Sequence, residues 1–110
     1  MDKRTEQAVM ELQLLEQNLQ NLNMQKQTFQ NQLIEVESAQ EELKKNPKKA
    51  YRIVGSIMVQ TPIKGLEKDL NSKKEIIDLR LKNIEKQEKN LNEKLQTIRN
   101  QVLEKLNKNG

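Results

Sequence analysis

The chain of 110 residues contains no cysteine and no histidine. Disulfide frameworks are therefore excluded, and the usual ligands of zinc and the usual nucleophile–base pairs are missing. The absence of cysteine also fits a reducing compartment. No G-x-x-x-x-G-K-[ST] phosphate-binding loop occurs either. From these absences we expect no enzyme, no cofactor and no metal site.

Long apolar runs are also missing. No stretch approaches the ~18 apolar residues that a membrane span requires, and the N-terminal residues do not resemble a signal peptide. We therefore expect a cytoplasmic protein that does not enter membranes. The chain is 34% hydrophobic and 33% charged, and Phe29 and Tyr51 are its only aromatic residues. This composition is too polar for a conventional globular core and indicates a narrow apolar seam instead.

The apolar residues that are present recur in a heptad pattern. With Leu12 as position a, every d position of the first half is apolar over five heptads, which predicts a coiled-coil helix over about residues 5–45. The d positions are Ala8, Leu15, Leu22, Phe29, Val36 and Leu43. The same pattern predicts a second helix over about residues 62–107. Its d positions are Leu70, Ile77, Ile84, Leu91, Ile98 and Lys105.

Helix-breaking residues are concentrated between these two arms. Both prolines and two of the three glycines lie between Pro47 and Gly65, so the arms should fold back antiparallel. At the first boundary, Asn46 suits a left-handed C-terminal cap. At the second, Thr61 suits an N-cap with Pro62 as the first helical residue.

An antiparallel pairing in which residue numbers sum to 110 matches apolar with apolar residues. In that register Leu15 meets Leu95. The polar seam residues Lys26 and Glu88 then fall in neighbouring layers and could form an ion pair that helps to fix the register. Registers shifted by seven residues also give apolar pairs, so the pattern leaves the choice open.

The central stretch AYRIVGSIMVQTPIKG does not have helical periodicity. It predicts a β-hairpin over about residues 50–60, with strands Tyr51–Val54 and Ile57–Gln60 around a Gly55-Ser56 turn. Because an isolated two-stranded hairpin is marginally stable, and this one has apolar residues on both faces, it predicts oligomerisation. The expected contact residues are Tyr51, Ile53, Val54, Gly55, Ile57, Met58 and Val59. The alternative is a disordered or collapsed loop between the helices.

The sequence thus predicts a mainly α fold, a long antiparallel two-helix coiled coil with one central β-hairpin, forming one unit over residues 1–110. This layout, the YRIVGSIMV motif and the helix stretch RLKNIEKQEKNLNEKL resemble the beta subunit of prefoldin, in its archaeal form with a single hairpin. The resemblance implies a hexamer with prefoldin alpha subunits, two alpha plus four beta, whose hairpins join an inter-subunit β-barrel. It also implies an ATP-independent chaperone that holds unfolded proteins between coiled-coil tips and passes them to a group II chaperonin.

If the resemblance holds, the two chain ends are the tips that contact unfolded clients. Several apolar residues there lie off the seam, and small seam residues would let the tip open. The candidates are Val9, Met10, Leu12, Ile98, Val102, Leu103 and Leu106. The alternative is that these residues widen the seam between the helices or are scattered surface residues.

The stretch KKNPKKAYR places Lys44, Lys45, Lys48, Lys49 and Arg52 within nine residues. A nucleic-acid site would normally interleave more aromatic residues with such cations, so a solvated loop explains the run better and we expect no nucleic acid partner. The alternative to a chaperone is a structural or scaffolding coiled coil that binds defined partners.

Overall fold

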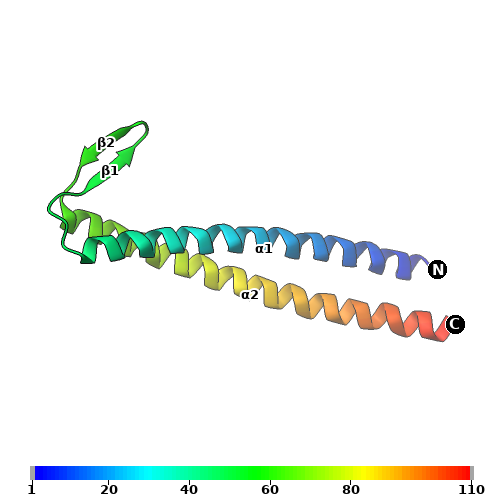
Figure 1. The fold of residues 1–110 in the computed structure, drawn as a ribbon. Coiled ribbons are helices and arrows are strands. Elements are labelled where there is room, and N and C mark those ends of the chain that lie inside the picture. The colour runs from blue at the N-terminus through cyan, green and yellow to red at the C-terminus, as the bar shows by residue number, and fades with distance from the viewer. Residues whose placement is uncertain (1, 110) are drawn as a thin grey trace. The chain divides into compact units, whose positions relative to one another are not determined.

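The computed structural model describes residues 2–109, with side chains described for residues 2–107. Along the chain lie helix α1 (Lys3–Lys44), strands β1 (Tyr51–Val54) and β2 (Ile57–Gln60), and helix α2 (Ile63–Asn109), as Figure 1 shows. The predicted pair of long helices around one antiparallel hairpin is confirmed. The contacts divide the chain into two compact units. We call Thr28–Leu81 the hairpin unit, and the chain before Thr28 together with the chain after Leu81 the chain-end unit.

In the chain-end unit, the two helices pack through the predicted heptad positions. The buried apolar residues are Leu15, Leu22, Ile84, Leu95 and Val102, and Leu95 is only 4% exposed. All of them are a or d positions, so the heptad assignment is confirmed here. Burying one side chain of this size stabilises the folded state by roughly 1.5–3 kcal/mol, and the seam therefore provides most of this unit's apolar stabilisation.

In the hairpin unit the two helices also pack through heptad d positions, since Val36, Leu43 and Ile77 are all buried. Polar contacts cross from one helix to the other beside these residues. Gln40 Nε2 donates to Asn71 Oδ1 at 2.9 Å, and the Arg80 guanidinium lies 5.3 Å from the centre of the Phe29 ring. The numbers of these paired residues sum to 111 and 109, so within this unit the register agrees with the predicted sum of 110.

Helix α1 ends as its sequence predicts. Asn46 has a φ of 56°, the left-handed conformation, which asparagine adopts more readily than most residues. The last turn tightens, since the amides of Lys45 and Asn46 donate to the carbonyls of Glu42 and Leu43, each at 3.3 Å. The chain then turns away from the helix before Pro47.

The predicted start of the second helix is wrong in detail. The Thr61 hydroxyl donates to the Val59 carbonyl at 3.1 Å and does not cap the helix. The Thr61 amide continues the hairpin ladder by donating to the Ala50 carbonyl at 2.9 Å, so this residue belongs to the base of the hairpin. The Pro62 carbonyl instead accepts the first helical hydrogen bond, from the Leu66 amide at 3.2 Å, and α2 begins at Ile63.

One polar layer interrupts the seam of the chain-end unit. Lys26 Nζ lies 3.5 Å from Glu88 Oε2, so the predicted pairing across the seam is confirmed. The two side chains are 29% and 17% exposed, and Glu88 Oε1 is buried without a hydrogen-bond partner among the described residues. Such a layer is less stabilising than an apolar one, but it disfavours registers that would separate the two charges.

Replacing both members of this pair should stabilise the chain, whereas replacing one should not. Lys26→Met leaves the partly buried Glu88 carboxylate unpaired and should lower the free energy of unfolding by about 1–3 kcal/mol. The double variant Lys26→Met/Glu88→Leu should be at least as stable as the natural chain. Urea unfolding of the natural chain, the two single variants Lys26→Met and Glu88→Leu, and the double variant measures these free energies. A double variant that is less stable than Lys26→Met would contradict the account.

Candidate functional site: the β-hairpin and the chain ends

The hairpin has an unambiguous register. Tyr51 pairs with Gln60, Arg52 with Val59, Ile53 with Met58, and Val54 with Ile57, leaving Gly55-Ser56 as a two-residue turn. The predicted strands and turn are confirmed. Gly55 has a φ of 62° and Ser56 is not in the left-handed region, the combination of a type II′ turn. Glycine is the residue that reaches this conformation without strain, which explains its place here.

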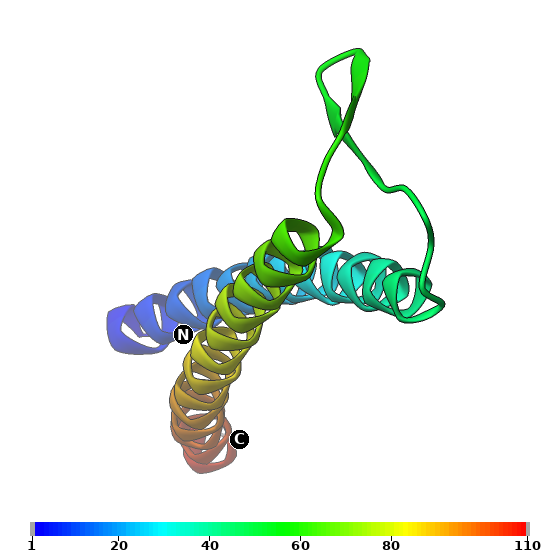
Figure 2. The ribbon, with the colours of Figure 1, turned by 90° about the vertical axis from the view of Figure 1, so that its left-hand side faces the viewer.

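Every residue of both strands is exposed. Because cross-strand partners point to the same side, one face carries Tyr51, Ile53, Met58 and Gln60, and the other carries Arg52, Val54, Ile57 and Val59. Ile53 is 73% exposed and Ile57 65%, one on each face. Figure 2 shows the hairpin standing clear of the helix ends from which it arises. Within the hairpin unit, no element covers either apolar face.

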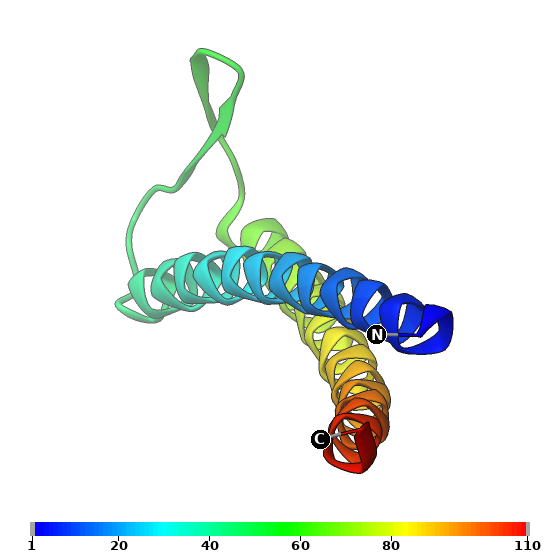
Figure 3. The same cartoon turned by 90° about the vertical axis from the view of Figure 1, so that its right-hand side faces the viewer.

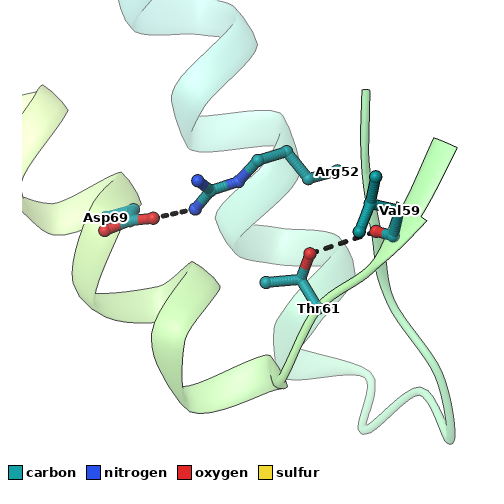
Figure 4. Close-up of polar contacts among 4 residues, drawn as sticks. All are labelled: Arg52, Val59, Thr61 and Asp69. Atoms are coloured by element: carbon teal, nitrogen blue, oxygen red, sulfur yellow. Dashed lines mark hydrogen bonds and ion pairs between the residues drawn. The ribbon is translucent and has the colours of Figure 1, made fainter. Parts of the chain in front are cut away.

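An ion pair links the hairpin to α2. The Arg52 guanidinium donates to the Asp69 carboxylate on α2, and the Thr61–Val59 hydrogen bond braces the base of β2 (Figure 4). The face that carries Arg52 is therefore turned toward α2. The face with Tyr51, Ile53 and Met58 is turned away from it, and both strand edges are free of pairing within the described chain.

The first residues of the chain are tied to α1 and to the end of α2. Asp2 Oδ1 accepts the Thr5 amide at 2.7 Å as an N-cap, and Lys105 Nζ lies 3.4 Å from Asp2 Oδ2. The hydrogen bonds from Thr5, with a smaller contribution from Lys105, lower the pKa of Asp2 to about 2. Thr5 itself is buried in the seam. Figure 3 views the molecule from this side.

Further exposed apolar residues lie on both helices of the chain-end unit. Met10 is 68% exposed and Leu14 58% on α1, and Leu103 is 57% and Leu106 46% exposed on α2. We call these four residues the chain-end apolar surface. Each pair is spaced three or four residues apart, so its members are neighbours on one helix face. Leu14 was not among the sequence candidates, although its spacing from Met10 and its place outside the a and d rows could have identified it.

The other predicted client-binding residues take part in the seam. Val9, Leu12 and Ile98 are half-buried and Val102 is buried. These four could contact another protein fully only if the two helices separated. Among residues 2–107, no group of carboxylates has the arrangement of a metal site. No described helix is long and apolar enough to cross a membrane.

The sequence matches known proteins over nearly its whole length. A sequence model of the family described as "Prefoldin subunit" matches residues 6–109. This chain belongs to the prefoldin subunit family. It is similar to the prefoldin subunit beta of Caldivirga maquilingensis, with 35% identity over 83% of this chain and 77% of the relative. It is also similar to that of Sulfurisphaera tokodaii, with 33% identity over 91% of this chain and 82% of the relative.

Solved prefoldin structures agree with this membership. The crystal structure of the prefoldin beta subunit from Thermococcus strain KS-1 superposes with a TM-score of 0.88 at 32% identity, covering 96% of this chain and 94% of that one. The beta2 subunit of the same strain shares the fold, with a TM-score of 0.73 at 18% identity. The resemblance to prefoldin beta subunits is confirmed. Prefoldin subunits are chaperones rather than enzymes and work in multi-subunit complexes, and this chain shares that role.

The N-cap at Asp2 predicts a pH dependence at the chain ends. Because the pKa of Asp2 is about 2 in the folded state and its ordinary value is 3.8, the cap contributes its full stabilisation above pH 3.8 and loses it as the pH falls toward 2. Amide hydrogen exchange at Thr5 and Glu6 should therefore accelerate across that window, beyond the change in the intrinsic rate. In Asp2→Ala the protection should already be absent at neutral pH. Equal protection in the two proteins at pH 6 would exclude the cap.

Proposed function

We propose that the chain is the assembly-forming and client-holding beta-type subunit of an ATP-independent prefoldin complex. One observation supports this most directly: every large apolar side chain of the two hairpin strands is exposed, and further large apolar side chains are exposed near the chain ends. Monomeric proteins rarely expose such groups without using them in an interaction. We assign the hairpin to subunit assembly and the chain-end apolar surface to unfolded clients.

The hairpin fits assembly because of its regular, ordered geometry. The two strands are paired at four positions, and their apolar side chains lie on both faces of the sheet. Both edges of the sheet remain free. Strands added from other subunits would satisfy the edges, and closure into a barrel would cover one face completely. The prefoldin alpha subunit is the expected partner, in the two-alpha, four-beta hexamer that the family resemblance implies.

The chain-end apolar surface fits a different kind of partner. Its side chains belong to outer helix positions that the seam does not use, and they include the flexible, polarizable Met10. Such groups can adapt to many unfolded sequences without a defined pocket. Holding of this kind needs only binding and release, so no nucleotide is required. Leu12, Ile98, Val9 and Val102 would add to the surface when the ends of the helices separate.

We further propose that held clients pass to a group II chaperonin in the cytoplasm, as the resemblance implies. Unfolded proteins leave such a surface by competition, since each apolar contact is individually weak. A chaperonin with exposed apolar sites could then accept the client. This step requires no chemistry from the chain itself.

Assembly should depend on the hairpin faces and not on chain stability. Ile53 is 73% exposed, so Ile53→Glu should leave the helicity and the unfolding midpoint of the separate chain almost unchanged. In a complex the same side chain would become a buried, unpaired charge, and the complex should be lost. Native mass spectrometry of the chain mixed with a prefoldin alpha subunit measures this.

The matched control for this test is Leu79→Glu, which places the same charge at a residue 62% exposed on α2. The control should form the two-alpha, four-beta species normally. Complexes that form equally well with Ile53→Glu would show that the hairpin is not the assembly element.

Client holding should depend on the chain-end apolar surface. Leu103→Gln/Leu106→Gln removes two exposed apolar groups without touching the seam, so assembly should persist while suppression of client aggregation falls severalfold. Light scattering of a chemically denatured client, diluted into the assembled complex without nucleotide, measures the suppression. Met10→Gln/Leu14→Gln should act in the same direction.

The control variant for client holding is Ile76→Gln/Leu79→Gln, an equally exposed pair at the same spacing on α2 but in the hairpin unit. It should retain most of the suppression. If both α2 variants lose it equally, the assignment to the chain ends is wrong. If neither does, the chain acts as a scaffold for defined partners rather than as a holding chaperone.

A further inference from the structure

The charge of the chain is concentrated around the hairpin. Residues 43–66 contain six lysines and arginines and no aspartate or glutamate, a net charge of +6. Since the whole chain has a net charge of +4, the remaining residues together carry −2. Such a concentration of one sign of charge in a short segment indicates a surface that attracts an anionic group.

Two of these six cations already have partners. Arg52 pairs with Asp69, and Lys45 Nζ lies 3.0 Å from Glu42 Oε1. The other four are exposed and have no ion pair or hydrogen bond with the described part of the chain. They are Lys44, Lys48, Lys49 and Lys64, which we call the cationic surface.

Three of these lysines line one pocket at the base of the hairpin. Lys48, Lys49 and Lys64 surround a volume of about 570 Å³ together with neutral residues of the same segment. These are Ala50, Gln60, Thr61, Pro62 and Ile63. The pocket adjoins the Ala50–Thr61 hydrogen bond that closes the strand ladder, so it continues the surface assigned to assembly. Its lining combines cations with aliphatic groups.

The complementary charge lies on the same chain. Residues 27–43 contain four glutamates and no cation. Glu37 lies 3.8 Å from Lys74, and Glu42 pairs with Lys45. Glu35 and Glu41 are exposed and without partners among the described residues, and Ile34 beside them is 61% exposed. We call Ile34, Glu35 and Glu41 the acidic strip.

We propose that the cationic surface of one copy of this chain docks on the acidic strip of a second copy, next to the hairpins that join them. Two regions of opposite charge on one chain can pair reciprocally about a two-fold axis, because each region of one copy then meets the opposite region of the other. Ile34 of one copy would supply the apolar contact for the aliphatic part of the other copy's pocket. This inference rests on the proposed role of the hairpin in assembly.

A second copy fits the cationic surface better than a nucleic acid does. Non-specific nucleic-acid sites combine a cationic track with aromatic side chains for stacking, and Tyr51 is the only aromatic residue in the segment. The acidic strip would also repel phosphates close to the lysines. Between two copies, the same acidic strip contributes attraction.

Charge reversal in the chain alone tests the proposal. The variants are Lys48→Glu/Lys49→Glu, Glu35→Lys/Glu41→Lys, and the combination of all four, each studied by sedimentation velocity over a wide range of protein concentration. A control, Lys82→Glu/Lys86→Glu, makes the same change of net charge at exposed lysines of the chain-end unit. Circular dichroism confirms that each variant folds.

Each two-residue reversal should raise the dissociation constant of the homo-oligomer about tenfold. The combined variant should restore it to near the natural value, and the control should leave it unchanged. Natural homo-oligomers should also weaken at about 1 M salt, where the Debye length falls to about 3 Å. A chain that stays monomeric at every concentration overturns the proposal, as does a combined variant no better than the single reversals.

Two further measurements distinguish the docking proposal from the role of the hairpin in assembly and from a nucleic-acid site. If Ile53→Glu abolishes assembly but the charge reversals do not weaken it, the hairpin role stands and the docking proposal fails. If Lys48→Glu/Lys49→Glu instead abolishes salt-sensitive binding of a single-stranded oligonucleotide while the homo-oligomer is unaffected, the cationic surface is a nucleic-acid site and the docking proposal fails.

Discussion

The constraint on which the rest of the structure depends is that the hairpin cannot be covered by its own chain. A sheet of two four-residue strands has two faces and two edges, and here all eight residues are exposed. The helices do not cover the hairpin, because their buried apolar residues already face one another in a seam of a and d positions. A two-stranded sheet of this kind is marginal in water on its own. We therefore propose that other subunits cover the hairpin in its stable state, which would explain why a fold of two helices forms a complex.

The narrow seam separates the residues that hold the fold from those available for function. Because the helices need only two positions in seven for stability, apolar side chains at outer positions contribute little to folding and are free to bind other proteins. Met10, Leu14, Leu103 and Leu106 occupy such positions. The Lys26–Glu88 layer favours one register at some cost in apolar burial, and the Asp2 cap favours one helix start. In the proposed function, stability and pairing therefore use seam and cap residues, whereas binding uses mainly the outer positions of the same two helices.

The heptads, the hairpin strands and the left-handed Asn46 could be predicted from the sequence because each depends on local spacing or on a single residue's conformational preference. The Lys26–Glu88 pair could be predicted because an antiparallel seam has few registers. Features that depend on distant neighbours were missed. Thr61 follows the strand ladder rather than capping the helix, since its amide reaches Ala50, and the Arg52–Asp69 contact joins residues with no periodic relation. The exposure of Leu14 could have been predicted as well, because this residue lies outside both the a and the d rows.

The central claim is that other subunits, and not the chain itself, cover the hairpin. Hydrogen exchange of the assembled complex, compared with that of the dilute separate chain, tests it most directly. The amides of Tyr51–Gln60 should exchange rapidly in the separate chain and become strongly protected in the complex, while those of Leu15–Leu22 in the seam should change little. Strand amides that remain unprotected in an intact complex would contradict the account.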